Sequence, residues 1–205
     1  MDSPLELPDA ILLEGVVTTD NPDGTCNISP MGSIVDWPIT RLRLRPFKTS
    51  TTYANLRRTG RGVLNVTDDV ELIARAAIGR LDPSPALVDI AEGGRYLADA
   101  CRWHAFVVDS IDDSHERTEI LCRVVHEGRL RDFFGFNRAK HAVIEAAILA
   151  TRVDILPTAE IQSELQRLAP LVEKTGSDAE HRAFHLLTEY VEDTLVSRAE
   201  AEGGA

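Results

Sequence analysis

The chain has 205 residues, of which 43% are hydrophobic and 27% charged, a balance typical of a globular protein with one domain, or one domain and an extension. Its net charge of −11 disfavours nucleic acid and anionic membrane surfaces as partners, because both are polyanions. No apolar run approaches the roughly 20 residues that span a bilayer, and an acidic start is unlike a secretory signal. We therefore expect a cytoplasmic protein that binds neither nucleic acid nor membrane.

The first elements are predicted strands. Residues 1–10 are expected to form a flexible lead-in, and residues 11–19 are rich in β-branched side chains. A tight turn follows at Asp23-Gly24, because glycine readily adopts the positive φ that a hairpin turn requires. Residues 26–33 should form the return strand, which we expect to be stopped by Pro30 and Gly32.

A basic strand comes next. Arginine and leucine alternate over residues 41–47, which predicts a half-buried strand with its arginines on one face. That face is either solvated or directed at an anion. The segment continues into a Thr/Ser-rich run that offers several N-caps for a helix over residues 52–59, with Gly60 as its stop.

The remaining elements change from mixed to helical. We expect a strand at 61–66, a helix at 69–78, a loop or lid at 81–94, and strands at 101–111 and 118–128 joined by a polar turn. After a linker, Asn137 should cap a buried helix over 138–151, and further helices should cover 159–168 and 179–199 before a frayed tail at 200–205. Strands followed by helices predict an α+β fold, namely an antiparallel sheet or barrel with a helical appendage.

The best candidate site combines positive charge, hydroxyl groups and a helix start. A phosphate monoester is bound well where these three features meet. The segment provides Arg45, Lys48, Thr49, Ser50, Thr51 and Thr52. The alternative is a solvated basic strand followed by ordinary helix capping.

A second candidate lies at the end of the first hairpin. Asn27 and Ser29 project to the same side, and Pro30 interrupts regular pairing before Met31 and Gly32. Backbone groups left unpaired there could bind the N–H and C=O edge of a heteroaromatic ring. The alternative is a strand that simply ends in a turn.

Cysteine and histidine spacing gives no metal site. Cys26, Cys101 and Cys122 form no CxxC pair, so we expect buried, reduced thiols. The histidines show no HExxH spacing, and no serine lies in a GxSxG frame. Catalytic residues are therefore not identified from the sequence.

Several short motifs in order resemble the flavin reductase-like, FMN-binding split-barrel superfamily. They are Asn27-Ile28-Ser29-Pro30-Met31, Arg45-Pro46, Thr49 to Thr52, Asn55-Leu56, Thr59-Gly60 and Leu64-Asn65-Val66. With the helix entry Phe136 to His141, the whole chain resembles the family called domain of unknown function 447.

The resemblance implies an antiparallel split β-barrel over residues 1–132 with a C-terminal helical region over 133–205 packed on it. It implies a homodimer with FMN at the subunit interface. The segment from Asn27 to Gly32 would line the flavin ring, while Arg45, Lys48 and residues 49–52 would bind the phosphate. Asn55 and Asn65 would support the ribityl chain or the pocket.

Three functions remain open at this point. The first is a flavin-dependent oxidoreductase of unknown substrate, although no nicotinamide-binding fingerprint is present. The second is a non-redox binding or biosynthetic protein that uses the same pocket for a nucleotide or a pterin-like compound. The third is a structural dimer module with a vestigial pocket.

Overall fold

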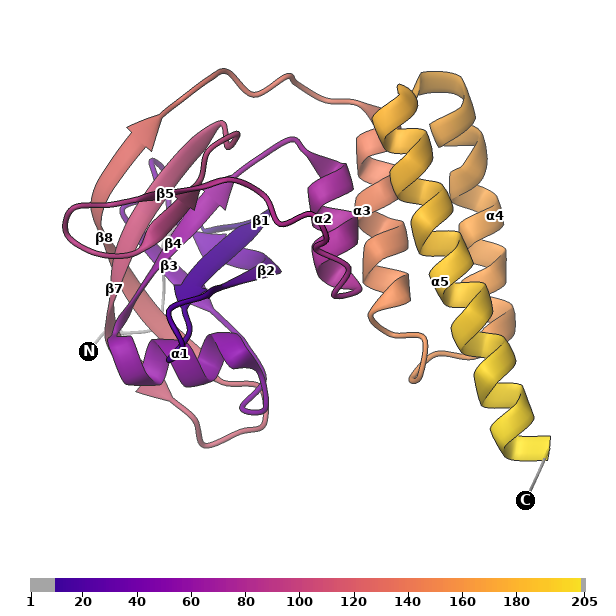
Figure 1. Cartoon of the computed structure of the whole chain (residues 1–205), viewed down its shortest axis with the longest axis horizontal. Helices are drawn as coiled ribbons and strands as arrows, with labels where there is room; N and C mark the ends of the chain where they lie inside the picture. The colour runs from indigo at the N-terminus through magenta and orange to yellow at the C-terminus, as the bar shows by residue number, and fades with distance from the viewer. Residues whose placement is uncertain (1–9, 204–205) are drawn as a thin grey trace. The chain divides into compact units, whose positions relative to one another are not determined.

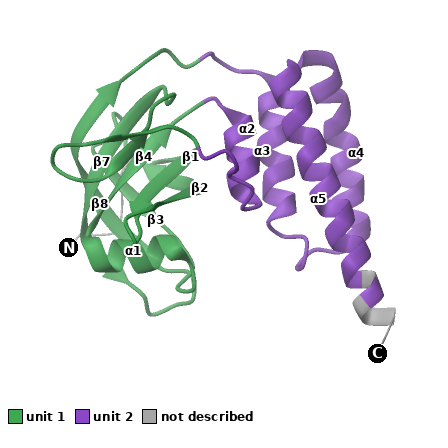
Figure 2. Cartoon of the chain, viewed as in Figure 1, with its two compact units in different colours: residues 1–67, 85–133 green, residues 68–84, 134–205 purple. Residues whose placement is uncertain are grey.

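The computed structural model describes residues 10–203, so most of the predicted lead-in lies outside the described residues (Figure 1). Its contacts divide the chain into two compact units (Figure 2). The barrel unit comprises residues 1–67 and 85–133, and the helical unit comprises residues 68–84 and 134–205. The predicted division into a barrel domain over 1–132 and a helical region over 133–205 stays a prediction.

The barrel unit is a closed antiparallel barrel with the strand order β1-β2-β3-β8-β7-β4. Its strands are β1 (Ile11–Asp20), β2 (Cys26–Val35), β3 (Arg41–Leu44), β4 (Arg61–Val66), β7 (Arg102–Asp112) and β8 (Glu119–Arg129). One helix, α1 (Thr51–Thr59), lies between β3 and β4 in the chain. Together with the C-terminal helices, this barrel confirms the predicted α+β class.

The first hairpin forms as predicted, but its second strand is longer. β1 and β2 pair without a break from Ile11↔Val35 to Asp20↔Cys26, around a turn in which Gly24 has φ +84°. β2 runs through Pro30, which is paired with β1. β3 pairs only with the last two residues of β2, Ile34 and Val35. Among the described strands, none lies on the other side of β2 at Pro30, so the missing N–H of proline is tolerated there.

Strand β3 shows the predicted alternation. Leu42 and Leu44 are completely buried in the barrel core, and Arg41 and Arg43 alternate with them on the opposite face. Tyr53 and Leu56 of α1 belong to the same core cluster. The helix therefore packs against the barrel interior, which fixes the position of the loop before it.

A short hairpin outside the barrel was not predicted. β5 (Leu87–Asp89) lies within the loop expected at 81–94, and β6 (Arg95–Leu97) follows directly after it. Arg95 donates to the carboxylate of Asp20 at 2.7 Å and to the carbonyl oxygen of Thr25 at 2.8 Å, and its neighbour Tyr96 stacks on Trp103 with ring centroids 4.9 Å apart. These long-range contacts, rather than local propensity, hold three-residue strands in place.

The helical unit contains α2 (Val70–Ala77), α3 (Arg138–Ala150), α4 (Thr158–Thr175) and α5 (Asp178–Gly203). Asn137 caps α3 as predicted, accepting from the backbone N–H groups of Ala139 and Lys140. α4 continues past its predicted end and through Pro170, because Val172 is buried in the shared core. α5 likewise continues through residues 200–203 of the expected tail; residues 204–205 lie outside the described part of the chain.

A buried carboxylate ties the helical unit together. Glu180, only 4% exposed, accepts from Lys140 Nζ at 2.8 Å and from Ser177 N and Oγ at 2.9 and 2.6 Å. The Ser177–Glu180 pair is the N-terminal capping arrangement of α5. Lys140 also donates to the carbonyl oxygen of Asp68, ahead of α2. Burial alone would raise the pKa of Glu180, but these hydrogen bonds outweigh it and bring the pKa to about 2.

We predict that Glu180→Gln destabilises the helical unit by about 3 kcal/mol at neutral pH, the free energy that corresponds to this lowering of the pKa. A carboxylate with a depressed folded-state pKa stabilises above its unfolded value of 4.5, and this contribution disappears as the pH falls to about 2. Urea unfolding as a function of pH measures the difference, with Glu173→Gln, an exposed change on α4, as the control. An equal effect of both variants at pH 7 would contradict the assignment.

Candidate functional site

The start of α1 presents backbone donors. Ser50 Oγ accepts from the N–H of Tyr53 at 3.2 Å and donates to the carbonyl oxygen of Phe47 at 2.7 Å, which both caps the helix and closes the preceding loop. The N–H groups of Thr51 and Thr52 lie in the first turn, where no intrahelical acceptor exists. With the helix dipole, such a terminus favours an anion.

The loop before α1 is attached to the turn that connects β7 and β8. Thr118 donates to the carbonyl oxygen of Pro46 through both N and Oγ1, at 3.0 and 2.8 Å. Lys48 N donates to the carbonyl oxygen of Glu116 at 3.0 Å. These bonds hold the backbone on either side of Phe47, and thus the starting points of the Arg45 and Lys48 side chains.

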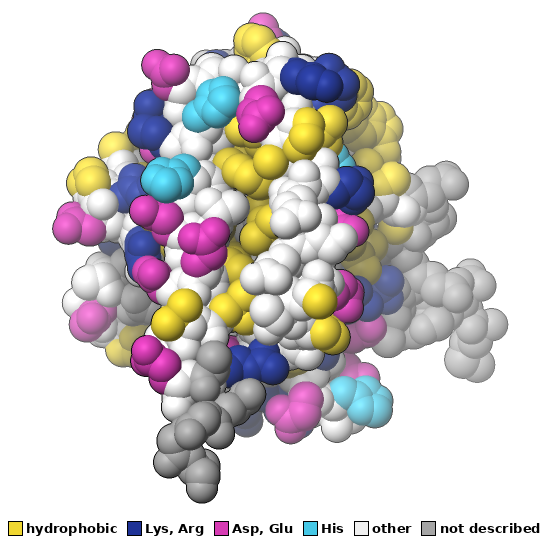
Figure 3. All heavy atoms as spheres, turned by 90° about the vertical axis from the view of Figure 1, so that its right-hand side faces the viewer, with side chains coloured by type: hydrophobic (Ala, Val, Ile, Leu, Met, Phe, Trp, Pro, Cys, Tyr) yellow, Lys and Arg dark blue, Asp and Glu magenta, His cyan; other side chains and the backbone are white. Residues whose placement is uncertain are grey.

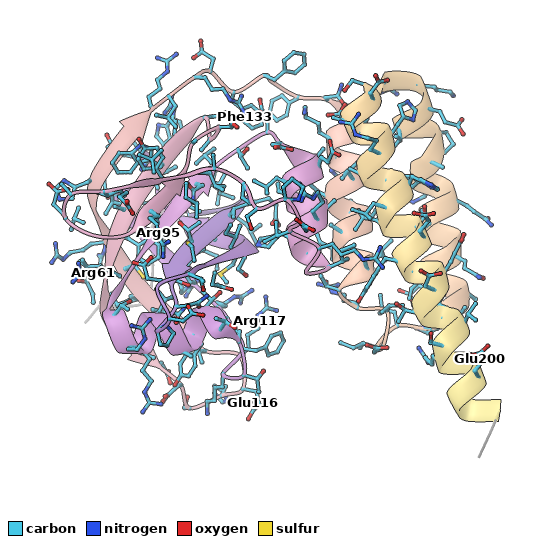
Figure 4. The ribbon with its side chains drawn as sticks, viewed as in Figure 1. Arg61, Arg95, Glu116, Arg117, Phe133 and Glu200 are labelled. Atoms are coloured by element: carbon cyan, nitrogen blue, oxygen red, sulfur yellow. The ribbon has the colours of Figure 1, made fainter. Side chains whose placement is uncertain are left out.

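The side chain of Arg117 also holds the loop before α1. Its Nε donates to the carbonyl oxygen of Arg45 at 3.2 Å, and its guanidinium lies 5.6 Å from the centroid of the Phe47 ring. Figure 4 shows Arg117 and Glu116 beside the loop that leads into α1. A further positive charge is thereby placed next to the candidate phosphate site.

Carboxylates near the site are already engaged. Tyr53 Oη donates to Asp113 Oδ2 at 2.6 Å, and this bond lowers the pKa of Asp113, with the charges of Lys48 and Arg57 acting in the same direction. Arg43 lies 3.6 Å from Glu119. Asp113 is therefore held ionised, and it ties α1 to the β7–β8 turn.

A polar network joins the first hairpin to α1. Asn27 Nδ2 donates to Oγ1 of Thr52 at 3.0 Å and to Oγ1 of Thr19 at 3.2 Å. Asn55 Nδ2 donates to the same Thr19 oxygen at 3.1 Å and to Asn21 Oδ1 at 2.8 Å. Two predicted sites that are separated in the sequence, the end of the hairpin and the helix start, therefore lie in contact.

The rest of the β2 segment forms an open edge. Ser29, Pro30, Met31 and Gly32 are half-buried and pair with β1, whereas β3 reaches β2 only at Ile34 and Val35. Within the described residues, the backbone groups on the other side of this segment have no strand partner. They are available to a ligand or to another chain.

Asn65 lies apart from the other predicted residues. It is fully buried, donates from Nδ2 to the carbonyl oxygen of Val16 at 3.0 Å, and accepts from the N–H of Leu97 at 2.9 Å. Its amide thus connects β1 and β6 on the outer side of β4. The structure does not bring it together with Arg45, Lys48 or the network of Asn27.

The thirteen predicted residues thus fall into four sets: Arg45, Lys48, Thr49, Ser50 and Thr51 around the loop; Asn27, Thr52 and Asn55 in the network; Ser29, Pro30, Met31 and Gly32 on the edge; and Asn65 alone. Sequence reasoning missed Tyr53, Asp113 and Arg117. The signal for Asp113 was its place in the predicted polar turn, and Arg117 stood between that turn and the next predicted strand. Which strand that turn would meet could not be read from local pattern.

No metal centre and no membrane-spanning helix accompany this site in the described part of the chain. Its residues contain no group of three or more His, Cys, Asp or Glu side chains that could hold a metal ion. Cys101 and Cys122 are buried, as predicted, whereas Cys26 is only half-buried. No described helix is both long and apolar enough to cross a bilayer.

Two family models match the chain. A model described as the N-terminal domain of a protein of unknown function, DUF447, matches residues 13–131, and a second model of the same family matches residues 137–189. These matches confirm the resemblance noted in the sequence. A comparison with curated protein sequences finds no match.

Solved structures with similar folds include flavoproteins. An FMN-bound protein of the DUF447 family from Methanosarcina mazei is 25% identical, with a TM-score of 0.73 over 87% of this chain and 94% of that one. The flavin reductase of styrene monooxygenase from Pseudomonas putida S12 is 17% identical, with a TM-score of 0.49 over 58% of this chain and 79% of that one.

The cap of α1 gives a direct test of the site's local structure. We expect Ser50→Ala to lower the free energy of unfolding by about 1 kcal/mol, because the Tyr53 N–H loses its acceptor. Thermal unfolding measures this loss. Thr49→Ala removes a neighbouring exposed hydroxyl and should change the stability little; if both variants lose the same amount, Ser50 is not the cap that matters.

Proposed function

Since the chain belongs to the DUF447 family, we propose that it binds FMN at the start of α1 and acts as a flavin-dependent oxidoreductase whose substrate is unknown. One observation carries the proposal. Arg45, Lys48 and the first N–H groups of α1 are held around one loop, in a chain whose relative from Methanosarcina mazei was solved with FMN.

The phosphate of FMN suits this loop chemically. A dianion is bound by charge-assisted hydrogen bonds from arginine and lysine and by backbone N–H groups at a helix terminus. Thr49 and Thr51 are exposed and can add hydroxyl donors, while Ser50 keeps the loop closed. The anchors from Thr118 and Glu116 mean that little backbone ordering remains to be done on binding.

The flavin ring suits the open edge of β2. The pyrimidine part of the ring has N–H and C=O groups in a plane, and an unpaired strand edge offers complementary backbone groups at residues 27–32. The Asn27–Thr52 bond connects this edge to the helix start. FMN, when bound, supplies hydride or electron transfer; the chain's part is to orient the ring and to tune it by hydrogen bonds.

We also propose a cytoplasmic homodimer. An open edge that is only half covered by its own chain is an expected place for a second subunit, and the ring would then lie between the two copies. The same phosphate donors would serve a nucleotide or a pterin-like ligand, so the released small molecule should be identified by denaturing mass spectrometry of native protein. Recovery of FMN supports the proposal, and recovery of a different phosphorylated heterocycle replaces it.

We predict that Arg45→Ala combined with Thr51→Ala weakens FMN binding at least about tenfold, since one charge-assisted hydrogen bond contributes roughly 1.5–3 kcal/mol. Riboflavin, which lacks the phosphate, should bind to the double variant as it does to the unchanged protein. Flavin fluorescence titration measures both. The matched control, Arg152→Ala with Thr151→Ala, removes the same residue types in the helical unit; equal FMN affinity in both double variants would refute the phosphate assignment.

The proposed oxidoreductase activity is tested separately from FMN binding. We expect flavin bound to the protein to bleach under anaerobic conditions when NADH or NADPH is added, and to recover its colour in air. Visible absorbance follows the reaction, and free FMN at the same concentration is the control. A bound flavin that bleaches only with dithionite would make the protein a flavin carrier rather than a nicotinamide-dependent reductase.

A further inference from the structure

A groove on the helical unit does not suit the phosphate of the proposed ligand. It lies between α4 and α5 and has a volume of about 600 Å³. In Figure 3, which views this side, hydrophobic side chains form a band between polar ones. Among the described residues that line the groove, none is arginine or lysine. A dianion finds no cation there, so we expect further contacts with the ligand beside α1 in the barrel unit.

The side chain of Asn27 has one half of its amide fully engaged. Its Nδ2 donates to Oγ1 of Thr19 on β1 at 3.2 Å and to Oγ1 of Thr52 on α1 at 3.0 Å. An amide NH₂ group has two hydrogens, so both are used. The two threonines are buried, with exposures of 3% and 2%. The nitrogen of the Asn27 amide is therefore directed into the packing between β1 and α1.

The hydrogen bonds of Asn55 agree with this direction. Its Oδ1 accepts from Nη2 of Arg58 at 3.3 Å, and a guanidinium can only donate. The Nδ2 of Asn55 then faces Thr19 and Asn21, and donates to Thr19 Oγ1 at 3.1 Å. The Thr19 oxygen thus accepts from two amides, which uses both of its lone pairs.

The other half of the Asn27 amide is available to a ligand. Asn27 is half-buried, and among the described residues none donates a hydrogen bond to its Oδ1. This oxygen lies on the side of the amide that faces away from both threonines. A ligand that covers the site must offer it an O–H or N–H group, because an acceptor that is buried without a donor costs free energy.

The position of Asn27 indicates which group of FMN supplies the donor. Asn27 bonds to the side chain of Thr52, whose backbone N–H is one of the first donors of α1 and part of the proposed phosphate site. Asn27 is therefore one side chain away from the phosphate. In FMN, the ribityl chain lies next to the phosphate and the ring lies beyond it. A ribityl O–H matches the Asn27 oxygen in both position and hydrogen bonding.

We propose that the side-chain oxygen of Asn27 accepts a hydrogen bond from a ribityl hydroxyl of FMN. Asn27 is then a specificity-determining residue, and the site selects ligands with a hydroxylated chain next to the phosphate. A ligand with a plain alkyl chain would cover the oxygen without giving it a donor. This inference rests on the proposed function of the barrel unit and adds the chemical class of the chain that the site accepts.

The resemblance gives the ribityl contact to Asn55, but the environment of Asn55 favours Asn27 for this role. Asn55 is 2% exposed. Its amide already bonds to Thr19 and Asn21 through Nδ2 and to Arg58 through Oδ1. Asn55 thus holds the network in place, whereas Asn27 has an acceptor left for the ligand.

An FMN analogue tests the contact without changing the phosphate or the ring. It carries a phosphopentyl chain in place of the phosphoribityl chain. We expect the unchanged protein to bind the analogue at least about tenfold more weakly than FMN, and Asn27→Leu to reduce this preference at least about fivefold. Fluorescence titration measures the four affinities. Equal weakening of FMN and the analogue by Asn27→Leu would refute the contact, whereas an unchanged protein that binds neither flavin would refute the proposed function itself.

Asn21→Leu is the matched control for this experiment. It removes the same residue type from the same network, but Asn21 bonds to Asn55 and Thr25 and to neither Asn27 nor Thr52. We expect it to leave the preference for FMN over the analogue unchanged. If it reduced the preference as much as Asn27→Leu does, disturbance of the network would explain the effect and the inference would fall.

Asn27→Asp tests whether the group that Asn27 offers is an acceptor. The carboxylate keeps one oxygen toward the ligand, and its other oxygen can accept from the hydroxyls of Thr19 and Thr52. Riboflavin, which has the hydroxyls but no phosphate, should lose no more than about threefold in affinity, whereas FMN should lose at least about tenfold because the added charge lies near its phosphate. A tenfold loss for riboflavin, or no loss for FMN, would overturn the assignment.

Discussion

The incomplete pairing of β2 is the constraint on which the barrel's proposed site depends. β2 pairs with β1 along its whole length, but with β3 only at Ile34 and Val35. Pro30 has no amide hydrogen and so could not donate to a fuller partner strand. The edge is nevertheless kept close to α1, since Asn27 bonds to Thr52 at 3.0 Å. Main-chain groups that would complete a sheet in an ordinary barrel are thus left beside a helix start that favours anions.

Local chemistry explains what could be predicted from the sequence. The Asp23-Gly24 turn, the Leu/Arg alternation of β3, and the cap at Asn137 each depend on residues within a few positions of one another. The same holds for the candidate phosphate segment, whose cations and hydroxyls are consecutive in the chain. Where these elements lie in the fold was predicted from the family resemblance, which covers both the barrel and the helices.

Contacts between distant segments explain what could not be predicted. β5 and β6 are too short to show a period, and they exist because Arg95 reaches Asp20 and Asn65 accepts from Leu97. The long-range bonds of Asn65, whose amide joins β1 and β6, could not be predicted from its neighbours in the sequence either. α4 passes through Pro170 because burial of Val172 outweighs the lost hydrogen bond. In each case tertiary packing overrode local preference.

The balance of charge at the site favours one cation over the others. The chain is acidic overall, but interactions between exposed charges are screened beyond about 8 Å at physiological salt, so only near neighbours decide what the loop binds. Arg43 has Glu119 within 3.6 Å, and Lys48 contributes to lowering the pKa values of Asp112 and Asp113, after the hydrogen bonds from Ser114 and Tyr53. Arg45 has no carboxylate partner among the residues described. Of the two cations in the proposed phosphate site, Arg45 therefore keeps more of its charge available than Lys48.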